Sequence, residues 1–277
     1  MRYLFLLILF SFNCSKTHDV VQRKTSEYVY SQNQQFQLAT PIINSNNVFF
    51  EKENLIELKL NYEGTRIFYT LDGSEPTEKS KKYFQPINLK KSSKIKAKAF
   101  HQDCQPSETV EQEFIKIRTN NSIKNLQLLT PPSKSYPANG AKSLNDQAKG
   151  SSNFRDGNWL GFQNDSIEIL LELESNLIFD QIIISHFEDP NSWIFMPRAI
   201  EIFTSKDGNS FQKIALLNPE PTKSTTPPRF NFLKAEIPKN KNHNFVKILL
   251  QNIPAIPDWH PGKGTPAWIF LDEILIQ

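Results

Sequence analysis

Apolar residues alternate with polar ones in many short runs of this chain, and this alternation constrains the fold more than any other feature. Residues 56–62 and 167–173 both show it. Successive side chains of a strand point to opposite faces, so a period of two predicts strands with one buried face. Turn signals such as Asp72-Gly73 separate the runs, and no segment of useful length has the period of a helix. The other runs expected to form strands are 66–71, 95–99, 113–117, 182–185, 199–204, 245–250 and 268–276.

The runs fall into two groups, which predicts two all-β domains. The first group occupies residues 40–117 and the second occupies residues 136–277. A chain of 277 residues is long enough for two domains of ordinary size. Residues 118–135 between the groups are polar and rich in Asn and Pro, so we expect them to form a linker.

The first 14 residues have the features of a leader peptide. Arg2 precedes an apolar stretch from Tyr3 to Phe12, which is too short to span a membrane comfortably. Cys14 follows at once, and this arrangement resembles a bacterial lipoprotein leader, in which the cysteine is lipidated. The residues before the cysteine, Ser11-Phe12-Asn13, depart from the usual lipoprotein pattern, so a plain secretory leader is the alternative. Residues 15–39 would then form a flexible tether, and the protein would be exported and anchored to the outer membrane.

Charge and motifs argue against several classes of function. The net charge is +3 and the basic residues are interspersed with acidic ones, so the basic patch of a nucleic-acid binder is missing. The sequence contains no nucleophile elbow, zinc-protease helix motif, phosphate loop or paired cysteine cluster. Asp272-Glu273 is an acidic pair close to the last aromatic residues, but strand alternation predicts that the two side chains point to opposite faces. Cys104 would be the one cysteine left after the leader, and we interpret it as structural. The sequence therefore predicts no enzyme.

A loop near the end of the chain combines aromatic rings with polar and turn-forming residues. Residues 258–264 read Asp-Trp-His-Pro-Gly-Lys-Gly and open onto the last apolar run. Indole rings are amphipathic and often lie half exposed, and the flat C–H faces of sugars pack on such rings while their hydroxyls need polar partners. We expect a ligand site formed by Trp193, Phe195, Arg198, Asp258, Trp259 and His260.

The alternative for each tryptophan is packing in the core. We assign Trp268 to the core because it alternates with Phe270 along a strand. For Trp159 the buried and the exposed interpretations are equally supported. His186 follows an apolar run and is interpreted as a structural histidine.

The first group of strands resembles a known module. The segment Phe68-Tyr69-Thr70-Leu71-Asp72-Gly73-Ser74-Glu75-Pro76-Thr77, followed by Tyr83, Pro86-Ile87 and residues 95–100, resembles the chitobiase/β-hexosaminidase C-terminal domain. This domain is an immunoglobulin-like sandwich that is also described as fibronectin-type-III-associated. The resemblance covers roughly residues 41–117. Asp72 and Glu75 are expected to serve the turn in this segment rather than catalysis.

The second group resembles a discoidin, or coagulation-factor C-type, domain, which implies a jelly-roll β-sandwich. The residues that carry this resemblance are 154–159 (Phe-Arg-Asp-Gly-Asn-Trp), Trp193, 196–198 (Met-Pro-Arg), 204–208 and 268–276. The tandem order is similar to the C-terminal tail of Bacteroidetes β-N-acetylhexosaminidases. The catalytic barrel of those enzymes needs about 250 residues, for which this chain leaves no room.

The second resemblance also implies a metal. Discoidin-fold sugar-binding modules hold a structural calcium between an Asp-Gly-Asn loop and a glutamate of the last strand, and the matching residues here are Asp156, Asn158 and Glu273. Calcium takes about six to eight oxygen ligands, so backbone carbonyls would complete the set. The alternative is a metal-free Asx turn with Glu273 in solvent.

These features predict an exported, lipid-anchored, non-catalytic protein that binds glycans and assists in the capture or degradation of amino sugars. A glycoside hydrolase or an outer-membrane protein would be its partner. The alternative is an adaptor whose Trp259 is a hot spot for another protein. A divergent N-acetylhexosaminidase is the third interpretation.

Overall fold

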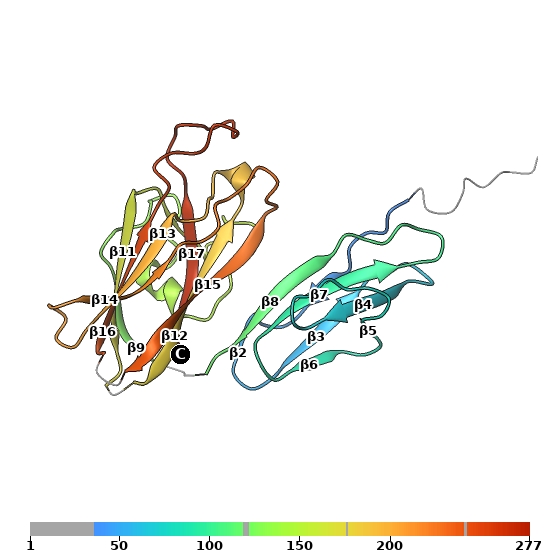
Figure 1. The fold of residues 1–277 in the computed structure, drawn as a ribbon, viewed down its shortest axis with the longest axis horizontal. Coiled ribbons are helices and arrows are strands. Elements are labelled where there is room, and N and C mark those ends of the chain that lie inside the picture. Colours follow the sequence, from blue (N-terminus) through green and yellow to red (C-terminus); the bar gives the residue numbers. More distant parts are fainter. Residues whose placement is uncertain (1–35, 119–121, 176, 241–242) are drawn as a thin grey trace, which may run out of the picture.

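The computed structural model describes residues 36–118, 122–175, 177–240 and 243–277. It consists of two β units that lie end to end (Figure 1). Apart from strands, the described chain contains two short 3₁₀ helices, η1 (Gly140–Leu144) and η2 (Pro190–Ser192). The prediction of an all-β protein is confirmed. No helix in these ranges is long and apolar enough to cross a membrane. The leader, Cys14 and most of the expected tether lie outside the described residues.

The first unit is a sandwich of two sheets with a core of its own. One sheet has the order β1-β3-β6 and the other the order β2-β8-β7-β4-β5. Alternation along β7 buries Ile95, Ala97 and Ala99 and turns the intervening lysines outward, as the sequence predicts. The strands are β1 (Ile42–Asn44), β2 (Phe49–Phe50), β3 (Asn54–Lys59), β4 (Arg66–Thr70), β5 (Lys81–Lys82), β6 (Ile87–Leu89), β7 (Ser93–Phe100) and β8 (Val110–Lys116).

The second unit is a larger antiparallel sandwich. Its sheets have the orders β10-β17-β12-β15 and β14-β13-β16-β11-β9. Residues from both sheets, such as Ile169 of β11 and Ile184 of β12, share one buried core. The strands are β9 (Ile123–Leu128), β10 (Leu160–Phe162), β11 (Ser166–Leu173), β12 (Phe179–Glu188), β13 (Ala199–Ser205), β14 (Gln212–Leu217), β15 (Arg229–Asn240), β16 (Phe245–Gln251) and β17 (Ile269–Ile276).

Part of the segment expected to link the two units forms a strand. β9 lies within residues 118–135 and pairs with β11, from Ile169–Leu128 to Leu173–Ile123. It is the edge strand of its sheet and three of its six residues are exposed, so its sequence carries little alternation. This segment therefore completes the second sandwich as well as connecting the units.

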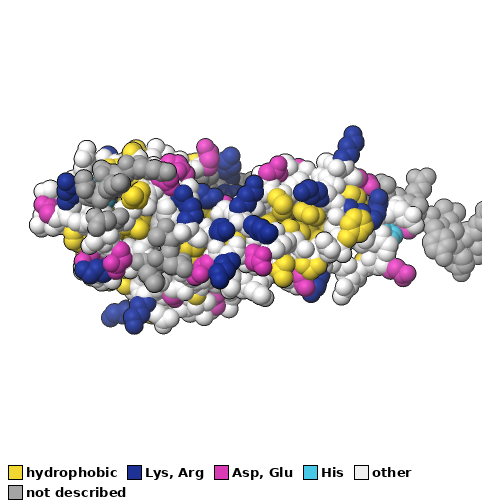
Figure 2. Space-filling view, turned by 90° about the horizontal axis from the view of Figure 1, so that it is seen from below, with side chains coloured by type: hydrophobic (Ala, Val, Ile, Leu, Met, Phe, Trp, Pro, Cys, Tyr) yellow, Lys and Arg dark blue, Asp and Glu magenta, His cyan; other side chains and the backbone are white. Residues whose placement is uncertain are grey.

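The two units touch through an apolar contact of their own. Phe49, Ile115 and Ile117 of the first unit pack with Ile183 and Leu275 of the second, and Phe232 covers the cluster. At the same junction, Lys234 forms an ion pair with Glu113, and the guanidinium of Arg118 lies 2.6 Å from Asp180. Several Lys and Arg side chains lie near this junction (Figure 2). The apolar cluster and the ion pairs together hold the units against each other.

Candidate functional site

The residues predicted to bind a ligand come mainly from two loops at one end of the second sandwich. β12 and β17 are antiparallel neighbours, so the segment after β12 meets the segment before β17. The first segment contains η2, and the second is the long loop at the top of Figure 1. Backbone hydrogen bonds join them, from Trp268 N to Trp193 O at 2.8 Å and from Phe195 N to Trp268 O at 3.0 Å.

Trp193 is held in a conformation that only a well-packed site maintains. It ends η2 with φ of 61°, in the left-handed region that costs energy for a residue with a bulky side chain. Asp189 caps η2 by accepting from Asn191 N at 3.1 Å. The indole lies on Gly262, where an added Cβ would come within 1.9 Å of Trp193 Nε1. A glycine at 262 is therefore required for this ring position.

His260 lies between the two loops. Its Nε2 is 2.8 Å from the carbonyl oxygen of Pro190, and its Nδ1 accepts a hydrogen bond from Gly262 N at 3.0 Å. A carbonyl accepts and an amide N–H donates, so the imidazole is neutral with its proton on Nε2. The ring is buried. It contacts Trp193 and Trp259 edge-on, with centroids 5.0 and 5.5 Å away.

The indole rings of Trp193 and Trp259 remain accessible above the buried ring of His260. Trp193 is 39% exposed and Trp259 is 43% exposed, although both are large apolar side chains. Trp259 also packs against Phe195 at 5.9 Å, and the neighbouring Asp258 is exposed. The arrangement offers two flat aromatic surfaces beside a carboxylate.

The residues of the predicted ligand set differ in exposure. Phe195 is 1% exposed and His260 is 6% exposed, so these side chains support the indoles rather than touch a ligand. Arg198 is exposed, and its guanidinium donates to Gln251 Oε1 at 2.7 Å, at the end of β16. Trp193, Arg198, Asp258 and Trp259 are the exposed members of the set.

The other two tryptophans belong to a second aromatic cluster. Trp159 is buried, and its Nε1 donates to Ser151 O at 2.9 Å. The buried interpretation of Trp159 is therefore the right one. Trp268 is partly buried and packs edge-on against Tyr136 at 5.2 Å. His186 is fully buried, and burial lowers its pKa to about 4, as suits a structural histidine.

The predicted calcium ligands do not come together as one set. Asp156 closes an Asx turn, because its two carboxylate oxygens accept from Ser151 N at 2.6 Å and Asn158 N at 2.9 Å. Glu273 is fully buried and accepts from Gln147 N. Among the described residues, no group of three or more His, Cys, Asp or Glu side chains could hold a metal ion. The Asx turn is present, but Glu273 is not in solvent.

A β-bulge brings Asp272 and Glu273 to the same loop. Ser185 of β12 pairs with Glu273 and His186 pairs with Leu271, so Asp272 is the extra residue of β17. Asp272 accepts from Gly150 N at 2.7 Å, while Glu273 accepts from the nearby Gln147 N. The prediction that the two side chains point to opposite faces is wrong because the bulge interrupts the alternation.

A buried lysine, Lys149, covers this acidic pair. Lys149 Nζ lies 2.6 Å from Asp272 Oδ2 and is held between the rings of Trp159 and Phe230, at 4.1 and 4.2 Å from their centroids. One oxygen of each carboxylate is buried without a hydrogen-bond partner, and burial raises the pKa of Glu273 to about 9. No local pattern indicates Lys149, because its partner Asp272 is more than a hundred residues away in the chain.

Comparison with known families identifies part of the first unit. The model of the family described as Fn3 associated matches residues 56–114. This match lies inside the segment expected to resemble a fibronectin-type-III-associated domain and confirms that part of the expectation. No curated protein matches the chain.

Solved structures with similar folds align with a little over half of the chain. CpGH89CBM32-5 from Clostridium perfringens, in complex with GalNAc-β-1,3-galactose, is 17% identical and covers 57% of this chain and 99% of its own, with a TM-score of 0.37. CpGH89CBM32-6 from the same organism is 14% identical and covers 58% and 95%, with a TM-score of 0.35. The C-terminal domain of a chitobiase from Bacteroides fragilis is 16% identical and covers 56% and 95%, with a TM-score of 0.32. Identities and TM-scores this low assign no ligand.

Proposed function

We propose that the second unit binds glycans weakly at the exposed faces of Trp193 and Trp259. The observation that carries this proposal is the pair of accessible indoles fixed on the buried ring of His260. Exposing two large rings costs hydrophobic free energy, which a packed sugar face would recover. Asp258 supplies an acceptor for sugar hydroxyls beside Trp259.

The shallow shape of this surface determines how tightly we expect it to bind a glycan. Two rings and one carboxylate offer few hydrogen bonds, so binding in the micromolar-to-millimolar range is expected, which corresponds to roughly −4 to −8 kcal/mol. N-acetylated amino sugars are the proposed ligands, in keeping with the tandem resemblance to hexosaminidase tails. Their N-acetyl methyl groups add apolar surface for a ring to cover.

The proposed role is non-catalytic. Hydrolysis of a glycosidic bond uses two carboxyl groups that flank the bond. Asp272 and Glu273 are fully buried beneath Lys149, Gln147 and Gly150, so a sugar chain has no access to them. We assign this pair to holding the loop of residues 147–150 on the sheet.

We infer that a divalent cation, calcium by the chemistry of its ligands, binds at Glu273 rather than at Asp156 and Asn158. Support comes from one carboxylate oxygen each of Asp272 and Glu273 that is buried without a hydrogen-bond partner, and backbone carbonyls would have to complete the ligand set. Oxygen ligands with negative charge suit calcium. The ion would displace the proton of Glu273 and stiffen the loop after η1.

Export, lipidation of Cys14 and anchoring to the outer membrane remain part of the proposal. They rest on the leader-like residues 1–14. A surface-anchored glycan binder would act beside a glycoside hydrolase or an outer-membrane protein, holding substrate close to the enzyme.

A glycan array probed with the full chain and with Trp259→Ala tests the proposal. Binding to amino-sugar glycans that disappears in the variant is expected. Leu216→Ala is the matched control, because Leu216 is a similarly exposed apolar residue of the same unit, on β14. If no glycan is bound and a membrane extract instead yields a protein whose capture requires Trp259, the adaptor role replaces the glycan role.

A further inference from the structure

A groove runs between the two units, on a different surface from the two indoles. One cavity of about 500 Å³ lies between residues 45–48 of the first unit and residues 147–152 of the second. Another of about 530 Å³ lies between residues 109–113 and residues 227–230. Ser152 and Phe230 line both cavities, so the two are adjacent along the junction between the units. The apolar contact between the units fixes the separation of the walls.

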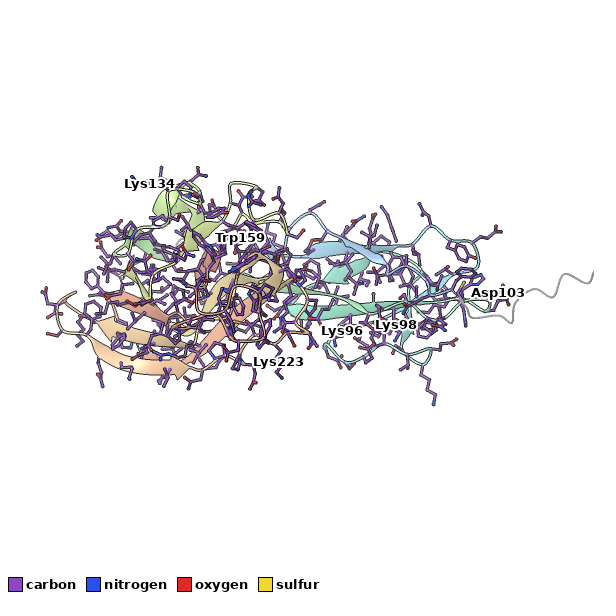
Figure 3. The ribbon with its side chains drawn as sticks, turned by 90° about the horizontal axis from the view of Figure 1, so that it is seen from above. Lys96, Lys98, Asp103, Lys134, Trp159 and Lys223 are labelled. Atoms are coloured by element: carbon purple, nitrogen blue, oxygen red, sulfur yellow. The ribbon has the colours of Figure 1, made fainter. Side chains whose placement is uncertain are left out.

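The wall formed by the first unit leaves one ammonium group with no carboxylate at hydrogen-bond distance. Lys94 and Lys96 of β7 line this wall together with Glu111 and Glu113. Lys94 pairs with Glu111 at 2.8 Å, and Glu113 pairs with Lys234 of the second unit. Lys96 lines the groove, and its Nζ lies 3.7 Å from Glu75 and 3.6 Å from Glu111. These separations exceed a hydrogen bond, so its ammonium protons are available to a ligand. Seen from above, Lys96 lies closer to the second unit than Lys98 does (Figure 3).

The opposite wall carries the guanidinium of Arg229, which a buried glutamate holds in place. Arg229 donates from Nε to Glu188 Oε2 at 2.7 Å. Glu188 is fully buried and also accepts from Thr222 and Asn231, so its position is fixed. Among the described residues, the two terminal nitrogens of Arg229 have no hydrogen-bond partner. They form a planar fork of the kind that binds carboxylate or sulfate oxygens.

The remaining lining suits a sugar chain. Phe230 presents a ring between the two cavities, and its other contacts keep it in place, with Trp159 stacked at 6.1 Å and Lys149 at 4.2 Å. The rest of the lining includes side-chain amides and hydroxyls, among them Asn46, Asn47 and Ser152, as well as apolar residues such as Pro227 and Pro228. Rings and neutral polar groups of this kind are the usual partners of a glycan. Lys96 and Arg229 are cations, so the ligand that they fit carries a negative charge.

We propose that the groove between the units binds an acidic oligosaccharide, with one carboxylate or sulfate group placed between Lys96 and Arg229. The ligand class rests on the proposed glycan-binding function, but the residues are different. The two units together form this site, because each contributes one of the two cations.

Titration calorimetry on the full chain at low salt tests the proposal. The probes are a hyaluronan octasaccharide for carboxylate, a chondroitin sulfate octasaccharide for sulfate, and chitohexaose as the neutral comparison. Arg229→Gln and Lys96→Gln should each weaken binding of an acidic probe by about tenfold, the effect of one lost charge-assisted hydrogen bond. Lys98→Gln is the matched control, since Lys98 has similar exposure on the same face of β7 but does not line the groove.

The outcomes separate this proposal from the indole site. Acidic probes that bind wild type and Trp259→Ala equally, and bind more weakly at high salt, support the groove. Acidic probes that do not bind, that lose affinity equally in Lys98→Gln, or that require Trp259 overturn it. Stronger binding of a polyglutamate peptide than of either octasaccharide also overturns it. If chitohexaose alone fails to bind, the proposed indole site is rejected and the proposed groove site still stands. Thermal unfolding of each variant verifies that it is folded.

Discussion

Asp272 and Glu273 are adjacent in β17, yet both carboxylates accept hydrogen bonds from the backbone of the same short loop, residues 147–150. The bulge that allows this also removes both groups from solvent. Asp272 and Glu273 look in the sequence like an exposed acid–base pair, but their role is to hold this loop in place. We call these two carboxylates together with Lys149 the clamp. The clamp holds the loop that carries Lys149, and Lys149 in turn fixes Trp159 and Phe230.

Removing the lysine from this clamp should be strongly destabilising. Lys149→Ala leaves the buried carboxylate of Asp272 without its ion-pair partner, and breaking such a pair costs about 3–5 kcal/mol. Urea unfolding of the variant checks this. The double variant Lys149→Met with Asp272→Asn should recover part of the loss. A single variant as stable as wild type would show that the pair contributes nothing.

Calcium should stabilise the second unit through Glu273. A cation present at about 100 times its Kd raises the free energy of unfolding by about 2.7 kcal/mol. The unfolding temperature should therefore rise when calcium is added and fall with a chelator, and Glu273→Gln should abolish the response. Asp156→Asn is the control and should keep it, because Asp156 only closes a turn. Equal unfolding temperatures with calcium and with a chelator would rule out the ion.

The contribution of His186 to stability should be lost as the pH is lowered, whereas Glu273, whose pKa burial raises to about 9, acts in the opposite sense. The pKa of His186 is about 4 in the folded protein, mainly through burial, and about 6.5 when unfolded. The unfolded state thus takes up the proton first, so the contribution is complete above pH about 6.5 and is lost as pH falls toward 4. The shift corresponds to about 3 kcal/mol. Urea unfolding of wild type and His186→Gln should show that wild type loses stability relative to the variant as the pH falls from about 6.5 toward 4, and a difference that does not change with pH would exclude His186.

A single methyl group should disturb the indole site. Gly262→Ala places a Cβ within 1.9 Å of Trp193 Nε1, so the ring must move. We expect altered tryptophan fluorescence and weaker glycan binding. Lys263→Ala, an exposed change in the same loop, should alter neither. Unchanged fluorescence and binding in Gly262→Ala would mean that Trp193 does not rest on residue 262.

The alternation of apolar and polar residues predicted both sandwiches well, because a strand with one buried face has an apolar residue at every second position. Ile167, Ile169 and Leu171 are all fully buried, as their spacing indicates. The same rule missed β9, whose residues are half exposed at a sheet edge, and it misplaced Asp272 because a bulge adds one residue without any local mark.

The sequence located the site only in part. The composition of the loop around Trp259 indicated exposure, and Trp259 is exposed. Composition could not separate Trp259 from His260, whose burial depends on the carbonyl of Pro190, 70 residues earlier in the chain. Such long-range contacts decide which polar residue faces solvent.

Titration calorimetry with chitohexaose on wild type, Trp193→Ala, Trp259→Ala and the Leu216→Ala control measures whether the two exposed indoles bind sugar. Wild type and the control should bind in the micromolar-to-millimolar range, and each tryptophan variant should lose about tenfold or more in affinity, because removing one stacking ring costs at least about 1.4 kcal/mol. Absence of binding at millimolar sugar, or equal affinity in all four proteins, would contradict glycan binding at the indoles.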